Sequence, residues 1–477
     1  MLVNCYPSED VFARVPELAP RVDPVLRQLD RVLDDDQLFA QVRRDLVQRY
    51  RLTAVHGRHS TPAEAILRLL VVKHLYAWSY QETVERVAES LVLRWFTRVY
   101  FRRVPAATTL LRWAQTIQPP TLHLLNDRAA QLAAQARVTR ARKLRVDGTV
   151  VETTIHHPTD SGLLGDGVRV LTRLLKRAQP LVGATLAGTR DVFRDRTRTM
   201  RRALAALHRL VRRKGEAVEA EQRQLYQHLI QTTEQVVQQA RQVSQAISAR
   251  LRRLRPSATA RARGERLRQA MTRFLPLVKQ VIQQTRTRVL EGGQVPAQEK
   301  IVSLFEPHTR ILQRRKTGVP IEFGRHVVLS EVEGGIVTRY RILPAGGGEQ
   351  PELEAAVAHH RTVFGRSPEL VAADRGFHAP QREARLQALG VKHAVIPWKG
   401  PAPAERRAQE HSRAWRRRYH WRAGIEGRIH SLRRDFGLKR CADHGEVGME
   451  RRVGWGVLAS NLWHIGQACA RRALKAG

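Results

Sequence analysis

The stretch Tyr419-His-Trp-Arg-Ala-Gly-Ile-Glu-Gly-Arg-Ile-His-Ser-Leu-Arg433 decides how the rest of the chain is interpreted. If it forms a helix, spacings of 3, 4 and 7 residues bring four polar side chains close to one face: Tyr419, Arg422, Glu426 and Arg433. An acid surrounded by arginines on one face indicates a site that holds a metal ion beside a polyanion. The alternative is a basic surface helix that contains a glutamate by chance.

The same four positions resemble the Y-x2-R-x3-E-x6-K signature of the DDE transposases of bacterial insertion sequences. Arg433 stands where that family usually has Lys. The resemblance implies a ribonuclease-H-like catalytic fold in which Glu426 is a catalytic acid. It also implies that Tyr419, Arg422 and Arg433 contact DNA.

The composition of the 477 residues points to the same class of partner. The chain has 83 Lys and Arg against 44 Asp and Glu, which gives a net charge of +39. Such a surplus predicts a polyanionic partner and binding that weakens steeply with salt. No apolar run approaches the roughly 18 residues of a membrane span, and no secretory leader is evident. We therefore expect a cytoplasmic, nucleoid-associated bacterial protein that does not bind membranes.

Residues 1–135 are predicted to form an all-helical DNA-binding domain. Ser60 or Thr61 could cap a helix over 63–76, and Ser79 begins another helix with Glu82 three residues later. The segment 60–113 also resembles the N-terminal helical domain of the same transposases, which implies binding of element ends. The alternative is a packing or dimerisation domain without DNA contact. Candidate phosphate contacts are Arg94, Arg98 and Arg112.

The first candidate acid of the core is Asp147. The alternating, β-branched segment 143–155 predicts a strand, and Asp147 lies within it, followed by Gly148. An acid in mid-strand is disfavoured unless it is paired or binds a metal. The alternative is an Asp-Gly turn between two short strands. The Asp-Gly-Thr run resembles the first catalytic segment of the family, which implies that Asp147 is the first metal ligand and leaves Asp160 and Asp166 outside the triad.

The second candidate acid is Asp374. The apolar run 369–373 predicts a strand, and the chain turns directly after Asp374. Acids at the carboxyl end of a strand lie where ligand sites form in α/β folds. The alternative is an aspartate that only caps a helix. The run Asp-Arg-Gly-Phe resembles the second catalytic segment of the family and implies that Asp374 is the second acid.

We therefore predict a mixed fold (α+β or α/β), in which a ribonuclease-H-like core is interrupted by a helical insertion. The predicted core parts are 140–168 and 299–477, and the coiled-coil-like insertion is 169–298. The insertion could serve dimerisation or DNA gripping, or be a spacer. Strands are predicted over 300–306, 309–315, 322–329, 336–343 and 391–396, with a turn at 316–318.

Three carboxylates without a His/Cys set favour hard cations, so we expect Mg²⁺ or Mn²⁺ at Asp147, Asp374 and Glu426, as two ions. The predicted function is that of a DDE transposase, which binds the terminal repeats of an insertion sequence and catalyses metal-dependent DNA cleavage and strand transfer. The expected partners are double-stranded DNA, as element ends and target, and further copies of the chain in a homodimer or higher oligomer. The alternatives are a related nuclease without strand transfer and a non-catalytic DNA-binding protein.

Overall fold

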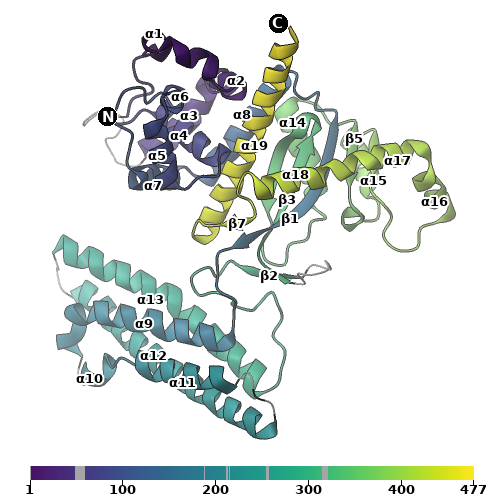
Figure 1. The fold of residues 1–477 in the computed structure, drawn as a ribbon. Helices are drawn as coiled ribbons and strands as arrows, with labels where there is room; N and C mark the ends of the chain where they lie inside the picture. Colours follow the sequence, from purple (N-terminus) through teal and green to yellow (C-terminus); the bar gives the residue numbers. More distant parts are fainter. Residues whose placement is uncertain are drawn as a thin grey trace. The chain divides into compact units, whose positions relative to one another are not determined.

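The computed structural model describes residues 2–48, 60–186, 189–210, 213, 215–253, 257–313 and 321–476 (Figure 1). Within it the chain forms two compact units, one of residues 1–152 with 325–477 and one of residues 153–324. No helix in these ranges is both long enough and apolar enough to cross a bilayer.

The first unit begins with helices, as predicted: α1 (Val11–Arg14), α2 (Pro24–Val32), α3 (Asp36–Val47), α4 (Ala63–Leu75), α5 (Tyr80–Glu89), α6 (Leu91–Phe96), α7 (Ala107–Thr116) and α8 (Pro119–Gln135). The predicted cap of α5 is confirmed, because the Ser79 hydroxyl accepts a hydrogen bond from the Glu82 amide. The predicted cap of α4 by Ser60 or Thr61 is wrong. Pro62 occupies that position without a side-chain hydrogen bond, and residues 57–59 lie outside the described ranges.

A mixed sheet follows, built from β1 (Lys143–Thr153), β3 (Ile321–Val332), β4 (Ile336–Ile342), β5 (Leu370–Ala373), β6 (His393–Val395) and β7 (Arg440–Cys441). Strand β1 lies between β3 and β5, and β6 continues the sheet beyond β5. The pairs β1–β5 and β5–β6 are parallel, whereas β3–β4 is antiparallel. The continuous β1 excludes the alternative of an Asp-Gly turn at Asp147.

Helices connect and cover these strands: α14 (Glu352–Phe364), α15 (Arg382–Ala388), α16 (Ala404–His411), α17 (Arg413–His420), α18 (Gly424–Arg434) and α19 (Gly445–Ala476). The helix expected over 419–433 is interrupted, because a 3₁₀ turn, η6 (Trp421–Ala423), separates α17 from α18. Trp415 is buried on α17 and packs with Leu370 of β5 and Val395 of β6. This contact fixes the start of the segment against the parallel edge of the sheet.

The N-terminal helices do not have a core of their own. One hydrophobic cluster joins residues from four elements: Leu29 of α2, Leu70 of α4, Leu329 of β3 and Leu462 of α19. Helix α19 packs along α2, α4 and α8 (Figure 1). The predicted boundary at residue 135 is therefore not a boundary between cores, because the apolar faces of the first helices are covered by the end of the chain.

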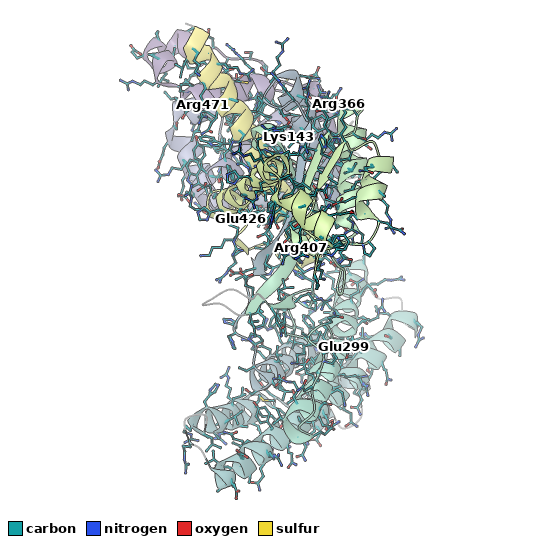
Figure 2. The ribbon with its side chains drawn as sticks, turned by 90° about the vertical axis from the view of Figure 1, so that its right-hand side faces the viewer. Lys143, Glu299, Arg366, Arg407, Glu426 and Arg471 are labelled. Carbon is teal, nitrogen blue, oxygen red and sulfur yellow. The ribbon has the colours of Figure 1, made fainter. Side chains whose placement is uncertain are left out.

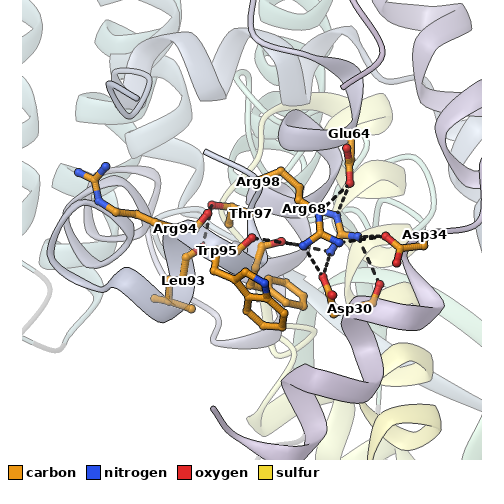
Figure 3. A network of polar contacts seen from close by, with 10 residues as sticks. Asp30, Asp34, Glu64, Arg68, Leu93, Arg94, Trp95, Thr97 and Arg98 are labelled. Carbon is orange, nitrogen blue, oxygen red and sulfur yellow. Dashed lines mark hydrogen bonds and ion pairs between the residues drawn. The ribbon is translucent and has the colours of Figure 1, made fainter. Parts of the chain in front are cut away.

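An ion network ties α2, α4 and α6 together (Figure 3). Arg68 is fully buried, and its guanidinium bonds Glu64 at 3.0 Å, Asp30 at 2.8 Å and Asp34 at 2.6 Å. Arg98 pairs with the same three acids at 2.9 to 3.2 Å. Two guanidinium groups thus share three carboxylates, and the third of these, Asp34, is 54% exposed to water. A buried charge is tolerated only with such partners.

The second unit is mainly helical, with α9 (Asp160–Val182), α10 (Thr189–Val192), α11 (Thr197–Leu210), α12 (Glu216–Arg253), α13 (Ala258–Thr285) and the short strand β2 (Arg310–Gln313). On α12 the apolar residues Val236, Val243 and Ile247 are buried in the helical core, as expected for a coiled-coil-like insertion. The strand predicted over 300–306 is wrong. Its apolar residues Ile301 and Leu304 pack into the helical core instead of pairing in a sheet. The turn predicted at 316–318 lies outside the described residues.

Candidate active site

The first two candidate acids lie side by side where the parallel pairing of β1 with β5 ends. In the parallel pair β1–β5, Val146 is opposite Ala373, so the next residues along each strand are Asp147 and Asp374. Neighbouring strands are about 4.8 Å apart, so the two carboxylates come from adjacent strands of the sheet. The pairing of β1 with β5 thus brings together two acids that are far apart in the sequence.

Arg422 connects the first acid to the third. Its guanidinium donates to Asp147 Oδ2 at 2.6 Å and to Glu426 Oε1 at 2.9 Å. Arg422 comes from the turn η6 and Glu426 from the first turn of α18, so the start of this helix faces β1. The Arg422 Nε atom is buried and makes no hydrogen bond. An unsatisfied buried donor beside two carboxylates marks a place where a further acceptor is missing.

Burial governs the ionisation of Asp147. Removal from water raises the pKa of Asp147 to about 6, and the neighbouring charges of Asp374 and Glu349 act in the same direction. Arg422 and the Gly148 amide oppose this shift by stabilising the carboxylate, but they do not cancel it. The raised pKa therefore reflects mainly the lost hydration of the Asp147 carboxylate.

This shift predicts a stability that depends on pH. Between the unfolded value near 3.8 and the folded pKa of about 6, the native protein holds a proton that the unfolded chain has released. Stability attributable to Asp147 therefore falls as pH rises through this window. We expect Asp147→Asn to raise the melting temperature in a chelating buffer at about pH 8, with a smaller gain at about pH 4.5.

Asp435→Asn is the matched control, for which we expect a change in melting temperature of the opposite sign. A hydrogen bond from Arg434 lowers the pKa of Asp435, so this carboxylate stabilises the fold above its unfolded pKa and ceases to do so as pH falls through its folded value. Its removal should therefore lower the melting temperature at about pH 8. An equal change at both pH values for Asp147→Asn would contradict the assigned burial cost.

The other two acids differ in their surroundings. Asp374 Oδ1 accepts the Gly376 amide at 2.7 Å, so it also caps the short turn η5 (Arg375–Phe377), as the alternative interpretation expected. The Glu426 side chain is 65% exposed and lies on α18 (Figure 2). Capping uses one oxygen of Asp374 and exposure leaves Glu426 accessible, so both acids retain oxygens for a cation.

Glu331 holds α18 and η6 against the sheet. This carboxylate on β3 is fully buried and accepts from Arg145 of β1 at 2.8 and 2.9 Å. It also accepts from Arg428 of α18 at 3.3 Å. Arg145 further donates to the Trp421 carbonyl at 2.6 Å. Because these bonds join two strands to the segment that carries Arg422, Glu331 is a positioning residue of the site.

Sequence reasoning missed His326 and Glu349, which lie beside the first acid. His326 Nε2 and Glu349 Oε1 are 2.5 Å apart. A Cβ placed on Gly148 would collide with both side chains, so the glycine permits their approach to β1. A glycine within a strand can signal such a close contact, but nothing in the sequence names the partners.

The donor chemistry of the site fits a hard cation. Asp147, Asp374 and Glu426 supply oxygen ligands, and Arg422 already places positive charge between two of them. Within the described ranges, no three His, Cys, Asp or Glu side chains converge closely enough to ligate one ion as they stand. The three acids are thus compatible with a metal ion in ligand type and charge. Their assignment as ligands stays a prediction.

The candidate DNA contacts have different surroundings. Arg433 donates to the Val150 carbonyl at 3.2 Å and pairs with Glu152 at 3.6 Å, and half-buried Tyr419 stacks on Trp415. Arg112 is exposed on α7.

Arg94 and Arg98 are engaged inside the N-terminal helices. The Arg94 guanidinium donates to the carbonyls of Ala88, Tyr100 and Arg102, and Arg98 belongs to the ion network of Arg68. These contacts argue for a structural role of both arginines. Their assignment to phosphate stays a prediction.

Two family models match the chain. One, described as "Transposase domain (DUF772)", matches residues 14–116, and one, described as "Transposase DDE domain", matches residues 322–462. The "Uncharacterized protein ORF8 in nfe locus" of Rhizobium meliloti is 31% identical over 127 residues, which are 25% of this chain and 61% of that protein. The chain thus matches about three fifths of the length of that relative. No solved structure matches.

The matched segments agree with the geometry. The second model includes Asp374 and Glu426, and a DDE domain implies a ribonuclease-H-like core, in keeping with the mixed sheet. Asp147 lies before the matched range and joins the site through the pairing of β1 with β5. With a transposase domain at each of these two places, the chain belongs to the DDE transposase family of bacterial insertion sequences.

Proposed function

We propose that this protein binds the terminal repeats of an insertion sequence and catalyses metal-dependent cleavage and strand transfer of DNA. The observation that carries the proposal is the placement of Asp147 beside Asp374, with Arg422 bonded to both Asp147 and Glu426. Three acids from two strands and a helix, in a chain of net charge +39, suit phosphoryl transfer on a polyanion.

In this proposal Asp147, Asp374 and Glu426 hold Mg²⁺ or Mn²⁺, as two ions. When bound, such ions supply Lewis-acid stabilisation of the charge that develops at phosphorus and its oxygens. The chain itself places the carboxylates of Asp374 and Glu349 near Asp147, and burial deprives the Asp147 carboxylate of the hydration that a bound cation would replace. Arg422, with its unsatisfied Nε, orients a phosphate oxygen beside the acids.

DNA binding is proposed to use two surfaces. Exposed cations lie on the helices α17 and α18 and just after them: Arg413, Arg416, Arg417, Arg434, Lys439 and Arg440. Residues 25–135 are proposed to recognise the element ends, with Arg112 as an accessible cation. Because these helices share their core with α19, footprinting must use the full chain. A homodimer or higher oligomer on DNA is proposed from family membership.

Substitutions at Arg422 and Arg433 test whether the first arginine acts by bridging two carboxylates and the second only by its charge. Lysine is a point charge and cannot bridge two carboxylates as a guanidinium does, so we expect Arg422→Lys to slow single-turnover joining by about tenfold or more. Arg433 donates to the Val150 carbonyl and lies 3.6 Å from Glu152. A lysine can also make such contacts, so we expect Arg433→Lys to stay within about threefold of wild type. Equal losses in both variants would contradict this division.

The decisive experiment incubates the purified protein and Mg²⁺ with a DNA library that carries candidate element ends, followed by sequencing of the products. Cleavage at the ends with joining to new DNA is the expected result. Cleavage without joining on any donor would instead identify a nuclease. Sequence-independent binding without cleavage, with or without Mn²⁺, would contradict the enzymatic proposal.

A further inference from the structure

A second basic site lies in the first unit, away from the candidate acids. A cavity of about 540 Å³ opens between the N-terminal helices and the start of α19. Its lining includes the cations Lys73, Arg451 and Arg452, together with one carboxylate, that of Asp443. This volume lies within the range of small-molecule sites and exceeds what a lone phosphate ion would fill.

Lys73 is the unusual member of this lining. Its side chain belongs to α4 and is 4% exposed, with the ammonium 4.5 Å from the centre of the Tyr80 ring. Within the described ranges no carboxylate forms an ion pair with it. Burial, reinforced by the charge of Arg452 and opposed by that of Asp443, lowers the pKa of Lys73 to about 8. A buried ammonium that makes no direct ion pair is costly, because the more distant charge of Asp443 does not replace its lost hydration.

The two arginines keep donors available. Arg451 donates one bond to the Gln115 carbonyl, and Arg452 donates one to the Gly437 carbonyl. A guanidinium has five N–H groups, so each retains several. Together with Lys73, they surround the cavity with donors for the oxygens of a phosphate.

Aromatic rings form another part of the wall. Trp78, Tyr80 and Trp455 line the cavity, and Trp78 is half-buried. Ala77, just before Trp78, has a φ of 53°, a left-handed conformation that costs energy for a residue with a Cβ. This conformation accompanies the hydrogen bond from the Trp78 amide to the Lys73 carbonyl at 3.0 Å. The strained turn therefore holds an indole next to the cations.

We propose that this cavity binds a nucleoside phosphate, with the phosphate at Lys73, Arg451 and Arg452 and the base against the indole of Trp78. Base–aromatic stacking tolerates every base, because each has a π-face. The bound group can be one unpaired nucleotide of a DNA strand or a free nucleotide. Both present a base beside a phosphate, which is a diester within a strand and a monoester in a free nucleotide, and neither depends on the candidate metal ligands.

The test is calorimetric titration of the full-length protein, in a chelating buffer, with thymidine 5′-monophosphate, thymidine and inorganic phosphate. We expect the monophosphate to bind more tightly than either fragment. Lys73→Met should weaken it by about tenfold or more, which corresponds to about 1.4 kcal/mol. The control Lys475→Met removes the same charge from an exposed position near the end of α19 and should leave the affinity unchanged within about twofold.

Trp78→Leu provides a second variant that does not disturb a buried charge. It should weaken the binding of the monophosphate while leaving the binding of inorganic phosphate unaffected. Displacement of the monophosphate by a short oligothymidylate would identify a DNA strand as the source, and displacement by free nucleotides alone would identify a free nucleotide. The proposal is overturned if Lys73→Met binds the monophosphate like Lys475→Met, or if thymidine or inorganic phosphate binds as tightly as the monophosphate. Because no cleavage is measured, failure here leaves the proposed transposase activity untouched.

Discussion

Asp147→Asn, Asp374→Asn and Glu426→Gln are each expected to reduce Mg²⁺-dependent DNA cleavage by about a thousandfold or more. Each change keeps the size of the side chain and removes the charge that attracts a divalent cation. Asp147 and Asp374 should be the most sensitive, because they lie on adjacent strands and share one site. Cleavage of a labelled element end under single-turnover conditions measures the loss.

Two controls show that the loss is catalytic. DNA affinity should be nearly unchanged in the three variants, since each removes a negative charge from a strongly basic protein. Asp166→Asn should cleave like wild type, because Asp166 pairs with Arg169 on the surface of α9. Full cleavage by any one of the three variants would remove that residue from the site.

Arg68→Ala is expected to destabilise the protein by about 3–5 kcal/mol, the typical cost of removing one partner from a buried ion pair. Three carboxylates would lose a shared counter-ion, and two of them, Asp30 and Glu64, have side chains that are 14% and 11% exposed. Arg98 would remain as their only cation in the network of Figure 3. Urea unfolding followed by tryptophan fluorescence measures the change.

Lys392→Ala is the matched control, because it removes a surface ion pair from the same unit. Lys392 is 69% exposed and lies 3.7 Å from Glu369. Such pairs contribute about 0–1 kcal/mol. Arg68→Lys should fall between the two, since it keeps the charge but loses the guanidinium fork. A loss for Arg68→Ala no larger than that for Lys392→Ala would show that the network does not stabilise the fold.

The candidate acids could be anticipated from sequence because each has local signals. Asp147 interrupts an alternating strand, and Asp374 ends an apolar run, so their segments were assigned correctly to β1 and β5. The same reasoning failed at 300–306. Ile301 and Leu304 are buried as a strand would require, but their partners are helices. Burial alone does not distinguish these two environments.

Features that depend on distant contacts were not visible in the sequence. Glu349 follows a glycine-rich loop and His326 lies on β3, so only the folded chain brings them to Gly148. Arg94 and Arg98 were expected to be accessible cations, yet their guanidinium groups bond within the N-terminal helices. Net charge predicts a polyanionic partner, but it does not say which arginines face it.

The packing of α19 along α2, α4 and α8 also sets the order of events during synthesis. The N-terminal helices leave the ribosome long before α19, and at about 5–20 residues per second the delay is on the order of tens of seconds. Until then Leu29 and Leu70 lack the apolar partner that covers them in the finished protein. A nascent chain in this state exposes apolar surface to which chaperones bind. A truncated mRNA that ends before the codons of α19 would yield a protein prone to proteolysis. Completion of translation thereby becomes a condition for a folded protein.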